Sequence, residues 1–252
     1  MNVVNIGEAP YTFVFLHGLF GQGRNWTTVA KKLLPLSSLL VDLPNHGRSE
    51  WTDRFSYEDM ADSVASFLSE LDHPVCLVGH SMGGRVAMMT ALTHPESVSR
   101  LVIEDTSPTN LTMDEFLTYA RAMSAIDPTG LTSRTQARGL LAQSVPDERI
   151  LGFLLQNLQP DENGQWHWIL NLDVLTRDMP QIGKWPTINA QYTGPVLWIT
   201  GEESTRTSPQ DIWSVKTLFP LARQLRVKSA GHWVHDDAPD VFADALRTFV
   251  QS

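Results

Sequence analysis

The most constraining feature of the sequence begins at residue 75. There a short apolar segment leads into a sharp turn around a serine, and an apolar helix-forming segment follows the turn. The turn reads Gly79-His80-Ser81-Met82-Gly83, and the segment from Val75 to Val78 before it is largely apolar. Strand, sharp turn and helix in this order are the context that a G-x-S-x-G pentapeptide needs to form a nucleophile elbow. Because such a turn brings the strand end against the helix start, a side chain at Gly79 or Gly83 would collide, and the serine backbone is strained. The pattern therefore predicts that Ser81 presents an exposed, nucleophilic hydroxyl.

Apolar segments of strand length recur on both sides of this turn and alternate with helical segments. Helical spacing of apolar residues marks residues 25–34 and 57–71. Continuous apolar strands are typical of parallel sheets that are covered on both faces. The alternation predicts an α/β fold with a mostly parallel, doubly wound sheet and right-handed crossovers. We expect its strands at residues 12–16, 38–42, 75–78, 101–104, 196–200 and 223–227.

Residues 108–193 interrupt this alternation. Three helix starts follow one another there, with Thr112, Ser133 and Asp147 as the capping residues. Residues 164–168 leave open a short extended segment. Successive helices cannot extend a parallel sheet, so we expect an inserted helical cap that lies over the active edge of the sheet. The core domain would then comprise residues 1–107 and 194–252.

The net charge, the apolar runs and the cysteine content of the sequence argue against several classes of partner. The chain has 252 residues and a net charge of −9 without any basic block, which argues against a nucleic-acid partner held through its phosphates. No apolar run approaches the roughly 20 residues of a membrane helix, and the first residues lack the pattern of a signal peptide. The single cysteine, Cys76, lies in a predicted buried strand. We therefore expect a cytoplasmic protein without a membrane partner, either a monomer or a weak homo-oligomer.

A serine nucleophile needs a histidine to take its proton and a carboxylate to hold that histidine. Catalytic groups of such a sheet collect beyond the carboxyl ends of the strands. Among the eight histidines His232 is the best candidate, since it follows the last strand and Gly231 allows a tight turn before it. His235 could share a helical face with His232, but no metalloenzyme spacing accompanies the pair, so we expect no metal site. We expect His17 to brace its own loop and His80 to point into the structure.

Two backbone N–H groups should stabilise the negative charge that develops on a carbonyl oxygen during attack. The residue after the nucleophile, Met82, would supply one of them. The other should come from the loop after the first strand, where Leu19 is the first candidate and Phe20 the second. The side chains of Phe20 and Trp233, with apolar residues of the cap, would line an acyl pocket. Ordinary packing between cap and sheet explains these two aromatic residues equally well.

These motifs, in their order along the chain, make the sequence resemble the α/β-hydrolase superfamily over nearly its whole length. A closer resemblance is to the bacterial YbfF-type esterases and the related abhydrolase-domain 11 proteins. It rests on His17-Gly18-Leu19-Phe20-Gly21, on Asn45-His46-Gly47 with Ser49, on residues 79–84 and on residues 231–235. The resemblance implies an α/β-hydrolase fold and an enzyme that hydrolyses small-molecule acyl esters or thioesters of modest acyl preference without a cofactor.

Two positions compete for the carboxylate that should hold His232. Most of the superfamily carries this acid in a Gly-x-x-Asp turn after the strand that ends here at Thr200, but this chain has Ser204 at the aspartate position and Glu203 one residue before it. Asp105, at the end of the strand after the elbow, preserves the order nucleophile, acid, base. The YbfF-like branch is similar in carrying its acid there. We therefore expect Asp105 to be the acid, with Ser204 nearby as a hydrogen-bond donor or substrate-binding residue.

The predicted function is hydrolysis through an acyl-enzyme, with Ser81, Asp105 and His232 as the catalytic residues. A lyase of the MenH type or a carbon–carbon bond hydrolase is the alternative, because a fold does not settle a reaction. MenH-like proteins, however, keep the aspartate that this chain replaces by Ser204. A non-catalytic ligand-binding protein is a third hypothesis. Dehalogenases and epoxide hydrolases are excluded, because they need an aspartate where this chain has Ser81.

Overall fold

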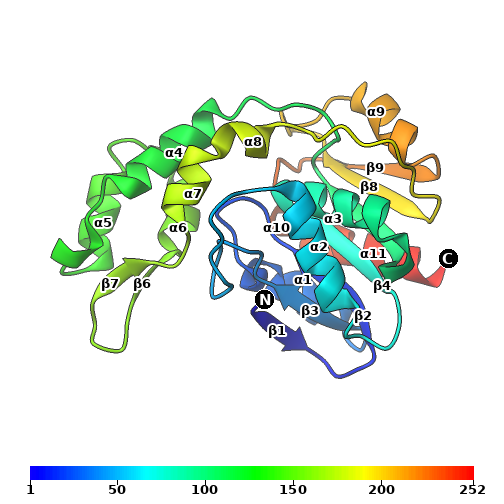
Figure 1. Cartoon of the computed structure of the whole chain (residues 1–252), viewed down its shortest axis with the longest axis horizontal. Helices are drawn as coiled ribbons and strands as arrows, with labels where there is room; N and C mark the ends of the chain where they lie inside the picture. The colour runs from blue at the N-terminus through cyan, green and yellow to red at the C-terminus, as the bar shows by residue number, and fades with distance from the viewer.

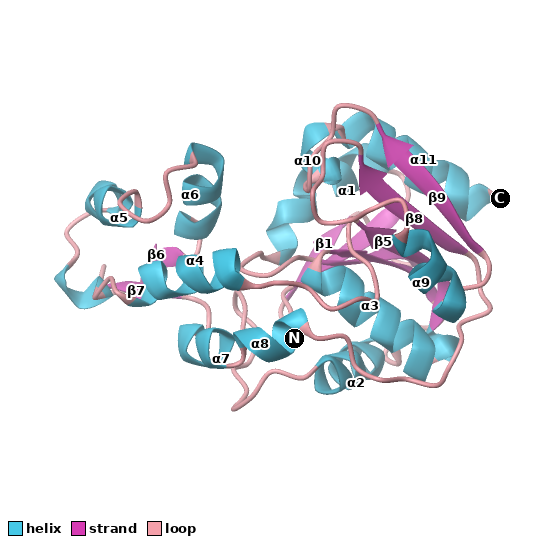
Figure 2. Ribbon diagram, turned by 90° about the horizontal axis from the view of Figure 1, so that it is seen from above, coloured by secondary structure: helices cyan, strands magenta, loops and turns pink.

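The centre of the molecule is a seven-stranded sheet, seen in a computed structural model that describes all 252 residues (Figures 1 and 2). The strands lie in the order β1-β3-β2-β4-β5-β8-β9, and neighbours are parallel except for the antiparallel pair of β1 and β3. This confirms the mostly parallel sheet of the predicted α/β fold. The strands are β1 (Val3–Ile6), β2 (Tyr11–Leu16), β3 (Ser37–Val41), β4 (Val75–His80), β5 (Val98–Glu104), β8 (Val196–Gly201) and β9 (Ala222–Val227).

Helices cover both faces of this sheet, as a doubly wound fold requires. Residues of α2 (Tyr57–Leu68), α3 (Met82–Thr93) and α9 (Asp211–Leu218) belong to the apolar cluster on one face. The cluster on the other face includes residues of η1 (Gly23–Trp26), α1 (Thr27–Leu33), α10 (Val234–Asp237) and α11 (Pro239–Gln251). A short turn of 3-10 helix, η2 (Pro95–Ser97), leads from α3 into β5.

Strand β2 is apolar at every buried position because both of its faces are covered. Val14 and Leu16 belong to the cluster on one face, and Phe13 and Phe15 belong to the cluster on the other. Side chains alternate between the two faces of a strand, so a strand that is covered on both faces has no position left for polar residues.

Some element boundaries differ from the sequence expectation. Strand β1 was not predicted, because it is a short edge strand whose residues are partly buried or exposed and so lack a continuous apolar pattern. The side chains of Ser133 and Asp147 accept backbone N–H groups at the helix starts, as predicted. The expectation for Thr112 was wrong: Met113 occupies the N-cap of that helix and makes no side-chain cap bond.

Residues 108–193 form a layer of short helices and one hairpin that stands beside the sheet in Figures 1 and 2. The extended segment that the sequence left open is strand β7 of this hairpin. The division of the chain into core and cap domains stays a prediction. The elements are α4 (Asp114–Ser124), η3 (Pro128–Gly130), α5 (Arg134–Leu141), α6 (Glu148–Leu155), β6 (Leu158–Pro160), β7 (Trp166–Trp168), α7 (Leu172–Arg177) and α8 (Met179–Gly183).

A fully buried arginine joins the two ends of this segment to the core. Arg85 lies on α3, and its guanidinium donates to the carbonyl oxygens of Thr109 and Ile182. Its charge also lies over the rings of Tyr57 and Trp185, at 5.4 and 5.6 Å from the ring centroids. The helix that follows the elbow therefore holds both the entry and the exit of residues 108–193.

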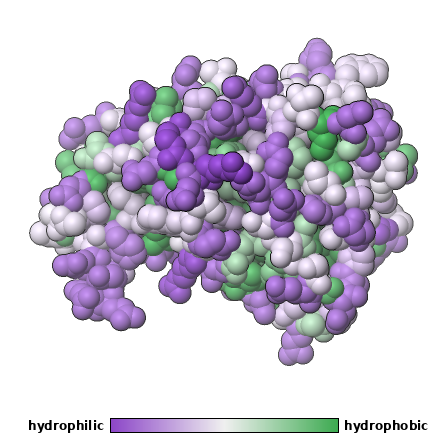
Figure 3. Space-filling view, in the orientation of Figure 1, coloured by the Kyte–Doolittle hydropathy of each residue, from purple (hydrophilic) through white to green (hydrophobic).

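The molecular surface is mostly hydrophilic on the face shown in Figure 3, with small apolar areas between the polar ones. The exposed large apolar side chains include Trp51, Trp213 and Leu221. None of the helices combines the length and the apolar composition that crossing a membrane requires.

Candidate active site

Ser81 occupies the tight turn between β4 and α3. Its backbone has φ +52° and ψ −117°, a conformation that side chains strongly disfavour. A Cβ added to Gly79 would overlap the backbone of Gly83, and one added to Gly83 would overlap the carbonyl of His17. These close approaches confirm the predicted geometry of the turn, and they explain why glycine stands on both sides of Ser81.

The His232 ring is held by Asp105. Its Nδ1 lies 2.7 Å from Oδ2 of Asp105, a fully buried carboxylate that directly follows β5. Three other groups donate to the same carboxylate: the Ser204 hydroxyl, the Thr207 hydroxyl at 3.1 Å and the Gly201 N–H at 3.2 Å. Four donors therefore fix the orientation of this carboxylate, and the Nδ1–H bond leaves Nε2 of a neutral His232 ring free to accept a proton.

The structure brings only one of the two competing carboxylates to His232. The side chain of Glu203 is exposed and forms no hydrogen bond with the ring. The hydroxyl of Ser204 donates to Asp105, and Ser204 is not among the residues that line the cavities at Ser81. Sequence reasoning missed Thr207, because a threonine in a loop carries no pattern that marks it as a partner of a remote aspartate.

Ser81 and His232 lie between two cavities, both of which they line. The first cavity has a volume of about 250 Å³ and extends past Leu19 and Trp233. The second has a volume of about 220 Å³ and extends past Arg206. No hydrogen bond joins the Ser81 hydroxyl to His232 in this structure. Catalytic hydrogen bonds are often long in unliganded enzymes and tighten when substrate binds.

The loop after β2 lies directly against the elbow. An added Cβ at Gly18 would lie 2.8 Å from Nδ1 of His80 and 3.3 Å from Cβ of Ser81. The backbone N–H groups of Leu19 and Met82 form no hydrogen bond within the protein, so both are free to bind an oxyanion. Phe20 is buried with a backbone φ of +62°, and its side chain lines neither cavity.

Two buried histidines brace the loops of the site. His17 donates from Nδ1 to the Gly18 carbonyl at 2.8 Å and accepts the Leu43 N–H at Nε2 at 3.0 Å. His80 donates from Nε2 to the carbonyl oxygen of His232 at 3.0 Å, and the two rings are 4.5 Å apart. Burial lowers the pKa of both His17 and His80, the latter well below its ordinary value. Both rings are therefore neutral supports.

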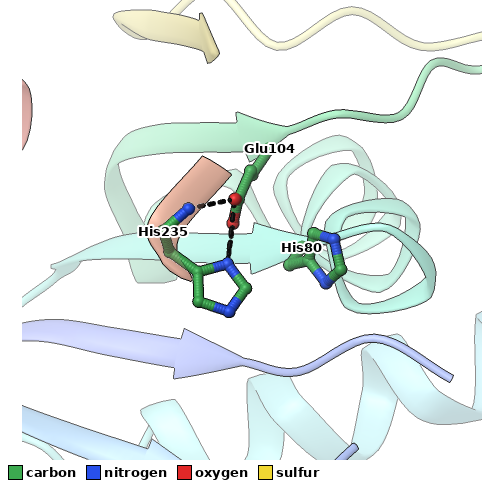
Figure 4. A group of neighbouring side chains, drawn as sticks. All are labelled: His80, Glu104 and His235. Carbon is green, nitrogen blue, oxygen red and sulfur yellow. Dashed lines mark hydrogen bonds and ion pairs between the residues drawn. The ribbon is translucent and has the colours of Figure 1, made fainter. Parts of the chain in front are cut away.

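A second histidine–carboxylate pair lies beside the first, and Figure 4 shows it with His80. Nδ1 of His235 lies 2.9 Å from both carboxylate oxygens of Glu104, and the His235 backbone N–H donates to the same carboxylate at 2.8 Å. Ligand atoms of His80, Glu104 and His235 all lie within 4.8 Å of one another, a set that suits a divalent cation. The hydrogen bonds of the His235–Glu104 pair engage Nδ1 of His235 and both carboxylate oxygens of Glu104. Sequence reasoning missed this pair, because Glu104 ends a buried strand and no motif links it to residue 235.

Trp233 lines the first cavity, and Arg149 from α6 covers its ring. The Arg149 guanidinium lies 4.9 Å from the centroid of the indole ring. Arg149 also forms ion pairs with Asp236 at 2.6 Å and Asp237 at 2.7 Å. The segment 108–193 thus contacts the loop that carries His232.

Comparison with known proteins supports the resemblance found in the sequence. A profile of the alpha/beta hydrolase family matches residues 13–245. The chain is 39% identical over 246 residues to the sn-1-specific diacylglycerol lipase ABHD11 of Mus musculus, covering 94% of this chain and 80% of that protein. It is 30% identical over 240 residues to Esterase YbfF of Escherichia coli, covering 94% and 92%. The solved structure of a marine microorganism esterase matches with a TM-score of 0.94 at 31% identity, covering 98% of both chains.

Proposed function

The chain belongs to the alpha/beta hydrolase family and resembles its YbfF and ABHD11 members, and from that premise we propose that it is a serine hydrolase of small to medium acyl esters. One observation carries the proposal. A strained turn presents Ser81 at a cavity that His232 also lines, and Asp105 binds the far nitrogen of that histidine. This arrangement suits activation of a serine by a histidine whose tautomer is fixed.

The proposed reaction proceeds through an acyl-enzyme. The Ser81 hydroxyl attacks the ester carbonyl while Nε2 of His232 takes its proton, and the N–H groups of Leu19 and Met82 bind the oxyanion. His232 then gives that proton to the departing alcohol. A water molecule attacks the acyl-serine in the same way, releases the carboxylic acid and restores Ser81. Each oxyanion donor is expected to contribute about 100-fold to 1,000-fold in rate.

The cavities support the size of the proposed substrate. The first cavity, about 250 Å³, lies just below the range of roughly 300–1,000 Å³ that is usual for ligand pockets. It therefore suits acyl groups of small to medium length. A thiolate can accept the proton from His232 as an alcohol does, so acyl thioesters belong to the same proposed class of substrates.

The proposal extends to the protein's localisation, its partners and its oligomeric state. We propose a cytoplasmic enzyme without a cofactor or a nucleic-acid partner, acting as a monomer or weak homo-oligomer. The free, buried thiol of Cys76 and the net charge of −9 support this setting. Burial raises the pKa of the Cys76 thiol, which keeps it protonated and unreactive.

The first test is substrate hydrolysis with a matched pair of serine variants. We expect the wild-type protein to release acid and alcohol from ethyl and 4-nitrophenyl esters graded by acyl length. Ser81→Ala should lower kcat by at least about 10⁴-fold, because it removes the nucleophile. Ser66→Ala, which changes an exposed serine on α2, should leave kcat unchanged.

Two further readouts separate the competing reactions. A fluorophosphonate probe should label the wild-type protein at Ser81 and fail to label Ser81→Ala. Elimination of pyruvate from a suitable substrate, without ester cleavage, would favour the lyase alternative and contradict the proposal. A folded protein that the probe does not label and that cleaves no ester would instead be a non-catalytic binder.

A further inference from the structure

The turn that carries Leu19 is held by hydrogen bonds from within and from the segment 108–193. The Gly21 N–H donates to the Gly18 carbonyl at 2.9 Å, which closes a four-residue turn with Leu19 and Phe20 at its centre. His17 donates to the same carbonyl from Nδ1 at 2.8 Å. Phe20 has a backbone φ of +62°, a conformation that residues other than glycine disfavour, so this turn needs support from its surroundings.

The support from the segment 108–193 is the side chain of Asn157, which follows α6 and is fully buried. Its Nδ2 donates to the Phe20 carbonyl at 2.8 Å and to the Leu154 carbonyl at 3.2 Å. Nε2 of Gln22, the residue after the turn, donates to Oδ1 of Asn157 at 2.8 Å. Carbonyl oxygens can only accept, so these contacts identify both ends of the Asn157 amide. Both ends are thus engaged, and each of them bonds to the turn or to the residue after it.

The planarity of the peptide group links these bonds into one chain. In a trans peptide the C=O of one residue and the N–H of the next point in opposite directions within the same plane. The Phe20 carbonyl accepts from Asn157 and shares its peptide with the Gly21 N–H. The Gly18 carbonyl accepts from Gly21 and shares its peptide with the Leu19 N–H. Asn157 therefore stands at one end of a chain of hydrogen bonds whose other end is the Leu19 N–H.

This chain acts on the Leu19 N–H in two ways. Each bond fixes the plane of one peptide and so the direction of its N–H, and hydrogen bonds in a chain polarise one another by about 10–30% per bond. We propose that Asn157 is a positioning residue for the oxyanion hole, which holds and strengthens the Leu19 N–H through this turn. The oxyanion donor then depends on the segment 108–193, to which Asn157 belongs. This inference rests on the proposed ester hydrolysis.

Two substitutions of Asn157 test the proposal. Asn157→Leu replaces the amide by an apolar group of similar shape, and Asn157→Asp keeps an acceptor for Gln22 but loses both donors. We expect kcat to fall by about tenfold to 100-fold, less than the loss of a whole oxyanion donor, because the Leu19 N–H is displaced and not removed. KM should stay within about threefold of wild type, because the donor acts mainly in the transition state. Rates are given per active site, counted by fluorophosphonate labelling run to completion, so unfolded protein does not contribute.

A thionoester separates positioning of the oxyanion hole from general support of the fold. The ester 4-nitrophenyl butanoate is compared with its thiono analogue, in which sulfur replaces the carbonyl oxygen. Sulfur is larger and accepts hydrogen bonds weakly, so the thionoester gains little from the oxyanion hole. We expect the ratio of kcat/KM for the ester to kcat/KM for the thionoester to fall by about tenfold in both Asn157 variants. A general loosening of the fold would lower both values and leave their ratio unchanged.

Asn171→Leu is the matched control. Asn171 is another buried asparagine of the segment 108–193, and its Nδ2 donates to Oδ1 of Asn45 at 3.0 Å and to the Thr52 carbonyl at 3.1 Å. Those partners lie in the loop after β3 and not in the turn, so Asn171→Leu should keep the wild-type ratio. Gln22→Met removes the donor to Asn157 and should lower the ratio by about threefold. It leaves Asn157 in place, so it tests the chain even if the Asn157 variants do not fold.

The outcomes distinguish this inference from the proposed function. Active ester hydrolysis with an unchanged ratio in both Asn157 variants and in Gln22→Met would overturn this inference alone. An equal fall of the ratio in Asn171→Leu would contradict it too, because any loosening of the segment 108–193 would then suffice. Absence of ester hydrolysis by the wild-type protein would overturn the proposed function and this inference together.

Discussion

At the scale of single residues, several hydrogen bonds fix the orientation of the buried Asp105 carboxylate that binds His232. His232, Ser204, Thr207 and the Gly201 N–H all donate to it, although they lie about a hundred or more residues further along the chain. A carboxylate accepts from several donors at once, and each bond restricts its rotation. Its orientation, and with it the orientation of the His232 ring, is therefore fixed before substrate binds.

Asp105→Asn should lower kcat by about 10³-fold to 10⁴-fold, because the amide no longer enforces the required tautomer of His232. Glu203→Gln makes the same chemical change at the competing position, where the side chain is exposed, and should leave kcat within about twofold of wild type. Steady-state ester hydrolysis measures both variants. An Asp105→Asn protein with kcat within tenfold of wild type would refute the assignment of the acid.

At the scale of elements, the short helix α10 positions the loop that carries His232. Its first turn is bound to β5 through His235 and Glu104. Its last residues bind the segment 108–193 through Arg149, and Asp237 also accepts the Gly231 N–H at 2.8 Å. A helix of four residues has little stability of its own, so these contacts with other elements determine where it lies.

Arg149→Gln should loosen the contact between α6 and α10 and so reduce kcat/KM by about threefold to tenfold. The magnitude follows from two partly exposed ion pairs, each worth up to about 1 kcal/mol. Arg138→Gln is the matched control, since Arg138 pairs with Glu148 entirely within the segment 108–193. Salt at about 0.5 M should lower the activity of the wild type and have less effect on Arg149→Gln, because the ion pairs are screened. Equal activities of the two variants would contradict the positioning role of Arg149.

At the scale of the whole molecule, three buried histidines lie at or beyond the carboxyl ends of β2, β3 and β4. Burial lowers the pKa of His17, His46 and His80, that of His46 to about 3. Above about pH 6.5 these rings are neutral in the folded and the unfolded chain alike. Below it the unfolded chain binds protons that the folded protein does not, so stability must fall as the pH drops from 6.5 toward the folded-state pKa values.

The free energy of unfolding should therefore decrease between about pH 7.5 and pH 5, by up to about 2 kcal/mol for each of these rings. Urea unfolding at the two pH values measures the decrease. His46→Gln removes one ring and should lose correspondingly less stability on acidification. His73→Gln, at an exposed position, should lose as much as the wild type. If His46→Gln also lost as much as the wild type, burial of that ring would not contribute to acid sensitivity.

Much of the fold and the position of the proposed nucleophile could be predicted from the sequence, because both depend on local patterns. The turn around Ser81, the apolar strands and the helix caps at Ser133 and Asp147 are properties of neighbouring residues. Strand β1 escaped prediction because its stability comes from pairing with β3, and its own four residues carry no clear pattern.

The sequence by itself determined that a serine in a sharp turn follows a parallel strand and that a histidine follows the last one. It favoured Asp105 over Glu203 as the acid that reaches that histidine, although both positions are close to it, and the strand order explains why both are close. Strands β5 and β8 are neighbours, so the residues that follow both of them lie at the same edge of the sheet, close to His232. Only the tertiary structure decided the pairing. It also brought together Thr207 with Asp105 and Glu104 with His235, because contacts between distant segments depend on strand order and loop packing, which no local pattern records.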